Sequence, residues 1–193
     1  MAKINPKQLH GPWATGYALD IHSTGSEFIG YDEYGHEQFD TKRTEIGELL
    51  YRVKYQGDDA ALDELVSTMA DFIRVKRKAV DMIVPVPPTR ARRVQPLFKI
   101  ADALGAKIKT PVVRNAVKKT GGSELKNLHS YEERRQALEH VIMADSKLVT
   151  GKRILLLDDL VRSGATINAV AEQLTSAGAT AVHVLAITQT RRQ

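Results

Sequence analysis

Residues 152–166 read KRILLLDDLVRSGAT, and this stretch decides the predicted fold. An apolar run from Ile154 to Leu157 leads into two adjacent carboxylates, Asp158 and Asp159, and then into a short loop of small and hydroxylated residues. A short apolar run bounded by polar residues is typical of a strand buried on both faces. A helix is predicted to follow, because apolar residues recur at helical spacing at Ile167, Val170, Ala171 and Leu174.

The rest of the chain continues this alternation of strands and helices. Apolar residues at helical spacing predict helices from residue 46 and from residue 62, a buried strand at 82–84, a helix at 97–104 ended by Gly105, and a last strand at 182–187. Strands that alternate with helices in this way indicate a parallel sheet covered by helices, so the predicted fold class is α/β.

The first 45 residues differ from this pattern. Tyr17, Leu19 and Ile21 alternate with smaller or polar residues, which indicates a half-buried strand. A turn at residues 24–26 would return the chain through residues 27–29. We therefore predict a hairpin-like appendage or hood over residues 1–45 and one main domain over residues 46–193.

Composition limits the functional classes. The chain has 193 residues, a net charge of +5 and no cysteine, which excludes disulfides, thiolate metal sites and a thiol nucleophile. No apolar run approaches the ~20 residues that cross a bilayer, so we expect no membrane association and a cytoplasmic location. The sequence pI is about 9.4, but the basic residues are scattered, so we expect at most weak binding to nucleic acid.

The two carboxylates and the loop after them point to a ligand. In open parallel sheets, ligands bind beyond the carboxyl ends of the strands, where Asp158 and Asp159 are predicted to lie. Two such carboxylates can accept hydrogen bonds from the 2′- and 3′-hydroxyls of a ribose and can hold a hydrated divalent cation. The following helix N-terminus offers free N–H groups to a phosphate, Gly164 permits close approach, and Ser163 and Thr166 add hydroxyls.

Simpler structural roles remain open for each residue alone. Asp159 could be a turn residue at a strand end, and Ser163 or Thr166 could be an ordinary helix cap. Other phosphate motifs do not fit, since the chain contains neither G-x-x-x-x-G-K-[ST] nor G-x-G-x-x-G. A receiver domain also carries adjacent acidic residues, but after its first strand and with a further Asp downstream.

The string ILLLDDLVRSGAT resembles the phosphoribosyl pyrophosphate (PRPP) signature of the type I phosphoribosyltransferases. That resemblance implies a parallel-sheet, Rossmann-like fold, with Asp158 and Asp159 on the ribose. It also implies that Mg²⁺ enters with PRPP near these two residues, without direct protein ligands. The 5′-phosphate loop would comprise Arg162, Ser163, Gly164, Ala165 and Thr166, where Arg162 replaces a threonine found in many members.

Two further segments extend the resemblance. The stretch IVPVPPTRARRVQP has a structural explanation as a proline-stiffened turn, but its arginines after a strand end also suit pyrophosphate. The family implies a pyrophosphate loop at this place, made of Pro88, Thr89, Arg90, Arg92 and Arg93. Lys118 and Lys119, before a glycine-rich polar stretch, resemble the flexible loop that closes over PRPP, although a lysine pair is more often simply solvated.

Residues 46–190 are also similar to the competence protein F (ComF) subfamily. The similarity includes VPVP followed by arginines and the segment GELLYRVKYQG, in which a helix ends in a Lys-Tyr-x-Gly sequence. Two features depart from that subfamily: the N-terminal zinc-ribbon cysteines are absent, and Arg93-Val94-Gln95-Pro96 replaces its usual Arg-Gly-Phe-Asn-Gln.

Two functions of different classes follow as hypotheses. In the first, the protein is a Mg²⁺-dependent phosphoribosyltransferase that transfers the 5-phosphoribosyl group to a small nitrogen acceptor and releases pyrophosphate. In the second, it is a non-catalytic PRPP sensor or an accessory protein for DNA uptake or processing. Neither hypothesis fixes the acceptor, and a homodimer is left open.

Overall fold

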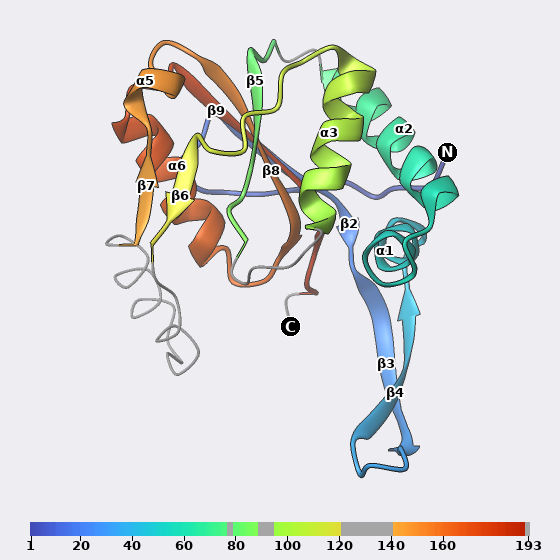
Figure 1. The fold of residues 1–193 in the computed structure, drawn as a ribbon. Helices are drawn as coiled ribbons and strands as arrows, with labels where there is room; N and C mark the ends of the chain where they lie inside the picture. Colours follow the sequence, from blue (N-terminus) through green and yellow to red (C-terminus); the bar gives the residue numbers. More distant parts are fainter. Residues whose placement is uncertain (77–78, 89–94, 121–140, 192–193) are drawn as a thin grey trace.

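A five-stranded, mostly parallel sheet forms the centre of the molecule (Figure 1). The computed structural model describes residues 1–76, 79–88, 95–120 and 141–191. The strand order is β1-β2-β9-β8-β5, and only β1 runs antiparallel to its neighbour. The strands are β1 (Lys7–Gln8), β2 (Thr15–Ile21), β5 (Met82–Pro85), β8 (Arg153–Val161) and β9 (Ala181–Gln189). The predicted α/β class with a parallel sheet is confirmed.

Helices cover both faces of this sheet because β8 is apolar on both sides. Leu155 and Leu157 pack on one face against α1 (Glu45–Tyr51), α2 (Asp59–Lys76) and α3 (Pro96–Ile108). Ile154 and Leu156 pack on the opposite face against α6 (Ala165–Ser176), beside the short helix α5 (Ser146–Val149). A π-helical turn, η1 (Arg52–Gln56), joins α1 to the loop before α2. The two hydrophobic cores give a three-layer α/β architecture.

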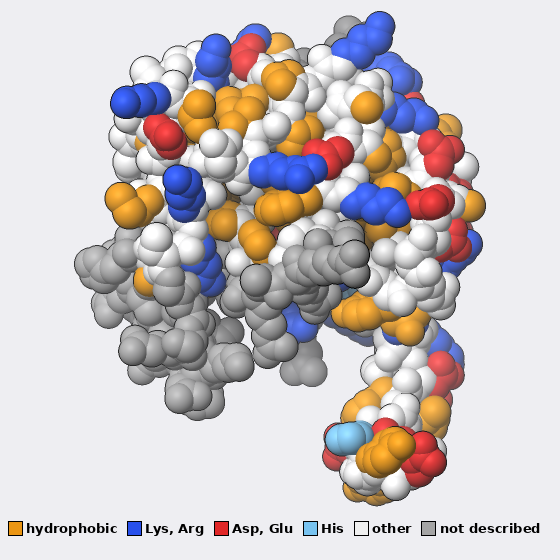
Figure 2. All heavy atoms as spheres, in the orientation of Figure 1, with side chains coloured by type: hydrophobic (Ala, Val, Ile, Leu, Met, Phe, Trp, Pro, Cys, Tyr) orange, Lys and Arg blue, Asp and Glu red, His pale blue; other side chains and the backbone are white. Residues whose placement is uncertain are grey.

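Two small antiparallel ribbons complete the fold. The strands β6 (Val117–Lys119) and β7 (Ile142–Ala144) pair beside α6. The strands β3 (Ser23–Tyr31) and β4 (Glu37–Arg43) form a long hairpin that projects away from the body in Figures 1 and 2. None of the helices in the described ranges has the length and apolar content that a bilayer crossing requires.

The structure places the N-terminal segment differently from the sequence expectation. The strand predicted at residues 17–21 is β2, and it is part of the central sheet rather than of an appendage, because its Tyr17 pairs with Leu185 of β9 and its Leu19 is fully buried. The turn predicted at residues 24–26 lies inside β3, and the chain reverses instead between Asp32 and His36. The projecting part therefore begins at Ser23, while the division at residue 45 stays a prediction.

Gly105 does not end its helix as expected. It lies within α3, which continues to Ile108, and Lys109 then adopts the left-handed conformation with a φ of 55°. A Cβ atom at Gly105 would lie 2.6 Å from a methyl group of Val112 and 2.7 Å from the carbonyl oxygen of Thr110. The glycine therefore serves close packing of α3 on the following segment.

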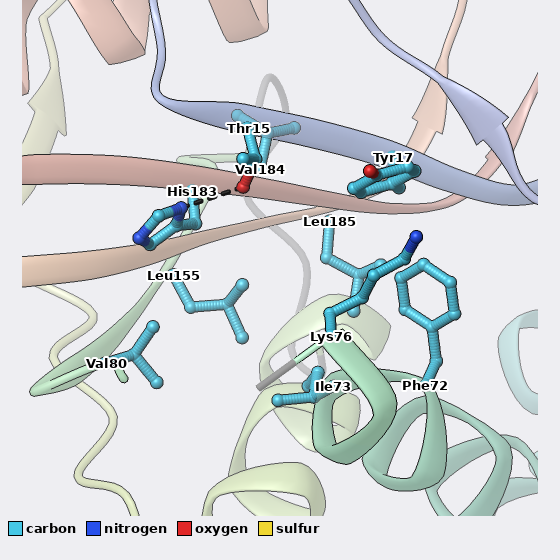
Figure 3. A pocket seen from close by; sticks show the side chains of 10 residues that line it. All are labelled: Thr15, Tyr17, Phe72, Ile73, Lys76, Val80, Leu155, His183, Val184 and Leu185. Carbon is cyan, nitrogen blue, oxygen red and sulfur yellow. Dashed lines mark hydrogen bonds between the residues drawn. The ribbon is translucent and has the colours of Figure 1, made fainter. Parts of the chain in front are cut away.

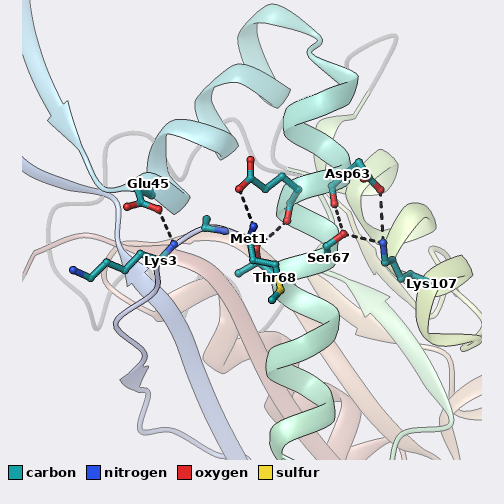
Figure 4. Close-up of polar contacts among 9 residues, drawn as sticks. Met1, Lys3, Glu45, Asp63, Ser67, Thr68 and Lys107 are labelled. Carbon is teal, nitrogen blue, oxygen red and sulfur yellow. Dashed lines mark hydrogen bonds and ion pairs between the residues drawn. The ribbon is translucent and has the colours of Figure 1, made fainter.

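Polar contacts hold the helical layer together on one side of the molecule (Figure 4). The N–H of Ala2 donates to Thr68 Oγ1 on α2 at 3.2 Å, and the N–H of Lys3 donates to Glu45 Oε2 on α1 at 2.7 Å. Lys107 Nζ of α3 donates to Ser67 Oγ of α2 at 2.8 Å. The N-terminal segment thus bridges α1 and α2, while α2 is tied to α3.

Helix α1 packs tightly against the end of β2 at a single glycine. Thr44 caps α1 by accepting from the Gly47 N–H, and its hydroxyl donates to the Ile21 carbonyl at 2.7 Å. A Cβ at Gly47 would lie only 2.1 Å from the carbonyl oxygen of His22, which is a backbone atom that cannot rotate away. The start of α1 therefore requires glycine at this position.

We predict that Gly47→Ala lowers the free energy of unfolding by about 1–3 kcal/mol, because α1 or the end of β2 must shift to admit the methyl group. Gly25→Ala is the matched control, since a Cβ there meets no atom within 4 Å. Its effect should stay within about 0.5 kcal/mol. Urea unfolding followed by circular dichroism measures both, and equal stability of the two variants would contradict the packing described.

Candidate functional site

Asp158 and Asp159 lie in β8 where that strand extends beyond its neighbour. Pairing of β8 with β5 ends at Leu157, whereas pairing with β9 continues to Val161. The predicted strand end at Leu157 was therefore wrong, because β9 supplies a partner for four more residues. The carboxylates nevertheless occupy the carboxyl edge of the parallel sheet, in the part of β8 that β5 does not cover.

The two side chains leave the strand toward opposite faces, as the alternation along an extended chain requires. Asp158 shares the face of Leu156, on the side of α6, and Asp159 shares the face of Leu157, on the side of α1 and η1. Asp159 Oδ2 accepts a hydrogen bond from Lys54 Nζ of η1 at 2.8 Å. Asp158 Oδ1 accepts from the backbone N–H of Asp159 at 2.9 Å.

The loop after β8 turns directly into α6. Gly164 has a φ of 85° and stands at the N-cap of α6, so glycine is needed for its conformation rather than for lack of space. The N–H of Ala165 donates to Ser163 Oγ at 3.4 Å. Arg162 and Ser163 are exposed, Thr166 is half-buried, and Ala165 is buried. This arrangement presents the first turn of α6 beside the carboxylate pair.

Neighbouring strands hold this loop and the pair in place. The N–H of Thr190, just after β9, donates to the Val161 carbonyl at 2.9 Å. The hydroxyl of Thr188, which is fully buried, donates to the carbonyl oxygen of Asp159 at 3.1 Å and lies 3.3 Å from His22 Nδ1. Burial lowers the pKa of His22, and the charges of Arg43 and Lys54 lower it further.

Sequence reasoning missed Lys54, His22 and Thr188 as neighbours of the pair. Lys54 lies 105 residues before Asp159 in the chain, so no local pattern connects the two. One available signal was the Lys-Tyr-x-Gly sequence, because it folds as a π-helical turn, a feature often found at functional sites. Its glycine, Gly57, has a φ of 67° and ends that turn.

The other predicted residues lie at the same edge or outside the described ranges. Pro88 is exposed and follows Val86, whose N–H donates to the Leu157 carbonyl at 2.9 Å, so the predicted pyrophosphate loop starts beside Asp158. Thr89, Arg90, Arg92 and Arg93 fall outside the described residues.

Lys118 and Lys119, predicted in a flexible loop, are part of strand β6. The side chain of Lys118 is exposed, whereas that of Lys119 is half-buried, and burial lowers the pKa of Lys119. The glycine-rich stretch that follows them, residues 121–140, is not described.

A cavity at the other end of the sheet is too small to be a substrate site (Figure 3). It lies near the beginnings of β8 and β9 and is lined on one side by Phe72 and Lys76 of α2. His183 Nδ1 lies 2.8 Å from Thr15 Oγ1 at its wall. Its volume of about 30 Å³ admits a water molecule or two, but not a phosphoribosyl ligand.

Comparison with known proteins identifies the family. The family model described as the phosphoribosyl transferase domain matches residues 61–193, a segment that includes β8, the carboxylate pair and α6. The chain belongs to the phosphoribosyl transferase family. The family agrees with the sequence resemblance, while membership of the ComF subfamily stays a prediction.

Solved structures of phosphoribosyltransferases are similar to this chain at low sequence identity. Adenine phosphoribosyltransferase from Leishmania tarentolae is 11% identical, with 96% of this chain and 94% of that chain covered and a TM-score of 0.52. Adenine phosphoribosyltransferase from Thermoanaerobacter pseudethanolicus is 16% identical, with coverages of 85% and 95% and a TM-score of 0.47. No curated protein matches the chain.

A larger enzyme contains a similar region. Glutamine PRPP amidotransferase from B. subtilis, complexed with ADP and GMP, is 20% identical over 77% of this chain, with a TM-score of 0.46. The chain described here spans only 28% of the length of that protein.

The carboxylate pair suits the way in which magnesium usually binds with phosphorylated substrates. Within the described ranges, no group of three or more His, Cys, Asp or Glu side chains could hold a metal ion. Mg²⁺ typically keeps several waters and is bound by one or two carboxylates together with substrate phosphates. Asp158 and Asp159 supply two carboxylates of this kind at the sheet edge, so the residues present fit a cation that arrives with its substrate.

The proximity of the two carboxylates has an electrostatic consequence. Burial, and then the negative charge of Asp159, raise the pKa of Asp158 to about 7, although the Asp159 N–H and the Lys54 charge oppose the shift. A carboxyl group with this pKa is partly protonated at neutral pH. The protein without ligand therefore holds less negative charge at this edge than two free carboxylates would.

We predict that Asp158→Asn changes how the stability of the protein depends on pH. Because the folded-state pKa is raised to about 7, the unfolded chain releases the Asp158 proton from about pH 4, while the folded chain keeps it. Wild-type stability should therefore fall as pH rises toward 7 and level off above it. The variant lacks this loss and should gain, relative to wild type, on the order of 2–4 kcal/mol between pH 4 and pH 8.

Urea unfolding of both proteins at several pH values, with EDTA present, measures this difference. Other titrating groups cancel in the comparison. Parallel stability curves for wild type and variant would show that Asp158 titrates normally.

A second prediction concerns the ion pair between Lys54 and Asp159. Lys54→Met should lower the free energy of unfolding at pH 8 by about 1–3 kcal/mol, because it leaves a half-buried carboxylate without its charged donor. Adding Asp159→Asn should recover part of the loss. Arg74→Met is the control, because Arg74 is 75% exposed and pairs with Asp71 on the same helix, and such pairs contribute at most about 1 kcal/mol. Additive effects of the Lys54 and Asp159 substitutions would rule out this coupling.

Proposed function

We propose that the protein transfers the 5-phosphoribosyl group of PRPP to a small nitrogen acceptor, with release of pyrophosphate. The observation that supports this best is the continuity of the candidate site. Two carboxylates at the carboxyl edge of the sheet are followed within five residues by a left-handed glycine that opens a helix. In a ribose 5-phosphate group the 2′,3′-diol and the 5′-phosphate are also close together, so one ligand can contact both the carboxylates and the loop.

In this proposal the two elements divide the ligand between them. Asp158 and Asp159 accept hydrogen bonds from the ribose hydroxyls, and the 162–166 loop binds the 5′-phosphate through N–H groups and the hydroxyls of Ser163 and Thr166. Arg162 is exposed at the edge of this loop and adds a positive charge. Pro88, Thr89, Arg90, Arg92 and Arg93 would bind the pyrophosphate, and Lys118 and Lys119 would contact PRPP, as the family resemblance implies. Mg²⁺ bound with PRPP would neutralise charge on the pyrophosphate.

Lys54 does not exclude a ribose from Asp159. A carboxylate has about four acceptor positions on its two oxygens, so one ammonium donor leaves room for a hydroxyl donor. The ion pair also fixes the direction of the Asp159 side chain before a ligand arrives. Such prior positioning lowers the entropic cost of binding.

The chemistry requires little from protein side chains beyond positioning and charge. If the C–O bond to pyrophosphate breaks ahead of attack, positive charge develops on the sugar ring, and fixed carboxylates nearby stabilise it. In the described part of the chain, His22 is a candidate base beside the pair, and its Nδ1 lies 3.3 Å from the Thr188 hydroxyl. The acceptor is therefore expected to bring a nitrogen lone pair of its own.

Substitutions should separate the two parts of the site. Asp158→Asn with Asp159→Asn should weaken PRPP and ribose 5-phosphate at least tenfold, since each lost charge-assisted hydrogen bond costs about 1.5–3 kcal/mol. Inorganic phosphate should still bind. Gly164→Val should weaken all of these ligands, because a branched residue disfavours the required φ of 85°. Calorimetry with Mg²⁺ measures each affinity, and wild-type circular dichroism confirms folding.

Unchanged PRPP affinity in the folded double variant would contradict the assignment of the pair. A separate screen of amines and nucleobases for pyrophosphate release tests turnover. Steady release with any acceptor supports the proposed transfer. Binding of PRPP without release would favour the alternative, a PRPP sensor or an accessory protein of the ComF type.

A further inference from the structure

The β3–β4 hairpin exposes an aromatic cluster far from the hydrophobic cores. Phe28, Tyr31 and Phe39 are 51%, 67% and 50% exposed. The ring of Phe28 contacts those of Tyr31 and Phe39 in edge-to-face geometry, with centroids 5.2 and 5.7 Å apart. In Figure 2 the hairpin stands clear of the body, with apolar and acidic side chains gathered at its far end. This aromatic cluster has no core to pack against within the described body.

The hairpin also has the opposite charge from the rest of the molecule. Between Gly25 and Thr41 the chain contains no Lys or Arg and five acidic residues, Glu27, Asp32, Glu33, Glu37 and Asp40. Since the whole chain has a net charge of +5, removing this −5 segment leaves +10 on the remainder. Glu27 is moreover the direct cross-strand neighbour of Asp40.

Both features are unfavourable for an isolated hairpin. A two-stranded ribbon alone is marginally stable in water, and like charges directly opposite each other destabilise it. Lys42 approaches Glu27 at 3.4 Å, but both side chains are largely exposed and the pair is weak. A basic, partly apolar surface laid against the cluster would offset both costs.

We propose that the β3–β4 hairpin is a docking arm that packs its aromatic cluster against the basic body of a second copy of this chain. The body is positively charged and the arm is negatively charged, so the arm of one copy is complementary in charge to the body of another. Two arms cannot pack on each other, because both are acidic. In a dimer with two-fold symmetry, each arm packs on the body of the other copy, so both arms are covered and the assembly is closed.

The exposed area is sufficient for such a contact. An aromatic side chain buries ~150–250 Å² when covered, and about half of each ring in the cluster is exposed. Two arms and the surfaces they cover then bury together on the order of 1,000 Å², near the lower bound for a specific interface. Nucleic acid and anionic lipid are disfavoured as occupants, because both would be repelled by the acidic arm.

Sedimentation velocity over a concentration series tests this proposal. The wild-type chain should form dimers at low ionic strength, and 0.5 M NaCl should weaken dimerisation at least tenfold by screening the charges. Phe28→Ser with Phe39→Ser removes the aromatic contact and should leave a monomer.

A charge reversal gives an independent variant. Glu27→Lys with Asp40→Lys keeps like charges opposite each other within the hairpin, but changes the charge of residues 25–41 from −5 to −1 and so removes most of the attraction to a basic body. This variant should also be monomeric, with the circular dichroism of a folded protein, and it decides the question if the aromatic variant does not fold. A wild-type monomer at all concentrations up to about 100 µM, or a dimer that both arm variants preserve, would overturn the proposal. Neither result depends on PRPP binding.

Discussion

The pairing of β8 with β9 beyond the end of β5 is the constraint on which the candidate site depends. It holds Asp158 and Asp159 in extended backbone after β5 has stopped, so their side chains point to opposite faces at an open edge. Two more hydrogen bonds hold the same segment of β8. The Thr188 hydroxyl donates to the carbonyl oxygen of Asp159, and the N–H of Thr190 donates to the carbonyl oxygen of Val161. The loop that opens α6 therefore starts from a fixed point. A shorter β9 would leave both the pair and the loop without support.

Two adjacent carboxylates at this edge are electrostatically unfavourable for the folded chain, and the surroundings compensate them unequally. Asp159 receives the Lys54 ammonium, whereas Asp158 accepts a backbone N–H in the described part of the chain, and burial raises the pKa of Asp158. Such local conflict between stability and charge is expected at functional sites, since a side chain chosen only for stability would be apolar here. The compensation by Lys54 comes from another layer of the fold, which makes η1 part of the candidate site.

The sequence predicted those features that depend on local pattern. The apolar run 154–157, the carboxylates after it and the glycine-containing turn identified a buried strand, its edge and the start of α6, because each follows from neighbours in the chain. Features set by distant contacts were not predictable in this way. The alternation at 17–21 indicated one buried face, but burial of both Ala18 and Leu19 follows from helices packed on both sides of β2. The local pattern predicts a helix end at Gly105. The glycine instead permits a tertiary contact with Val112, which no local pattern reveals. Lys54 reaches Asp159 only after α1 has packed on β9.

The projecting hairpin and the candidate site share their point of attachment. β2 passes into β3 at His22, whose N–H donates to the Gln189 carbonyl and whose own carbonyl oxygen contacts the start of α1 at Thr44. His22 Nδ1 lies 3.3 Å from the Thr188 hydroxyl that holds Asp159. On the returning strand, Arg43 stacks over Tyr51 of α1 with its guanidinium 3.9 Å from the ring centroid. Because the base of the hairpin is built into the contacts that position the carboxylates, fixing the arm on another molecule also restrains the edge of the sheet on which the pair lies.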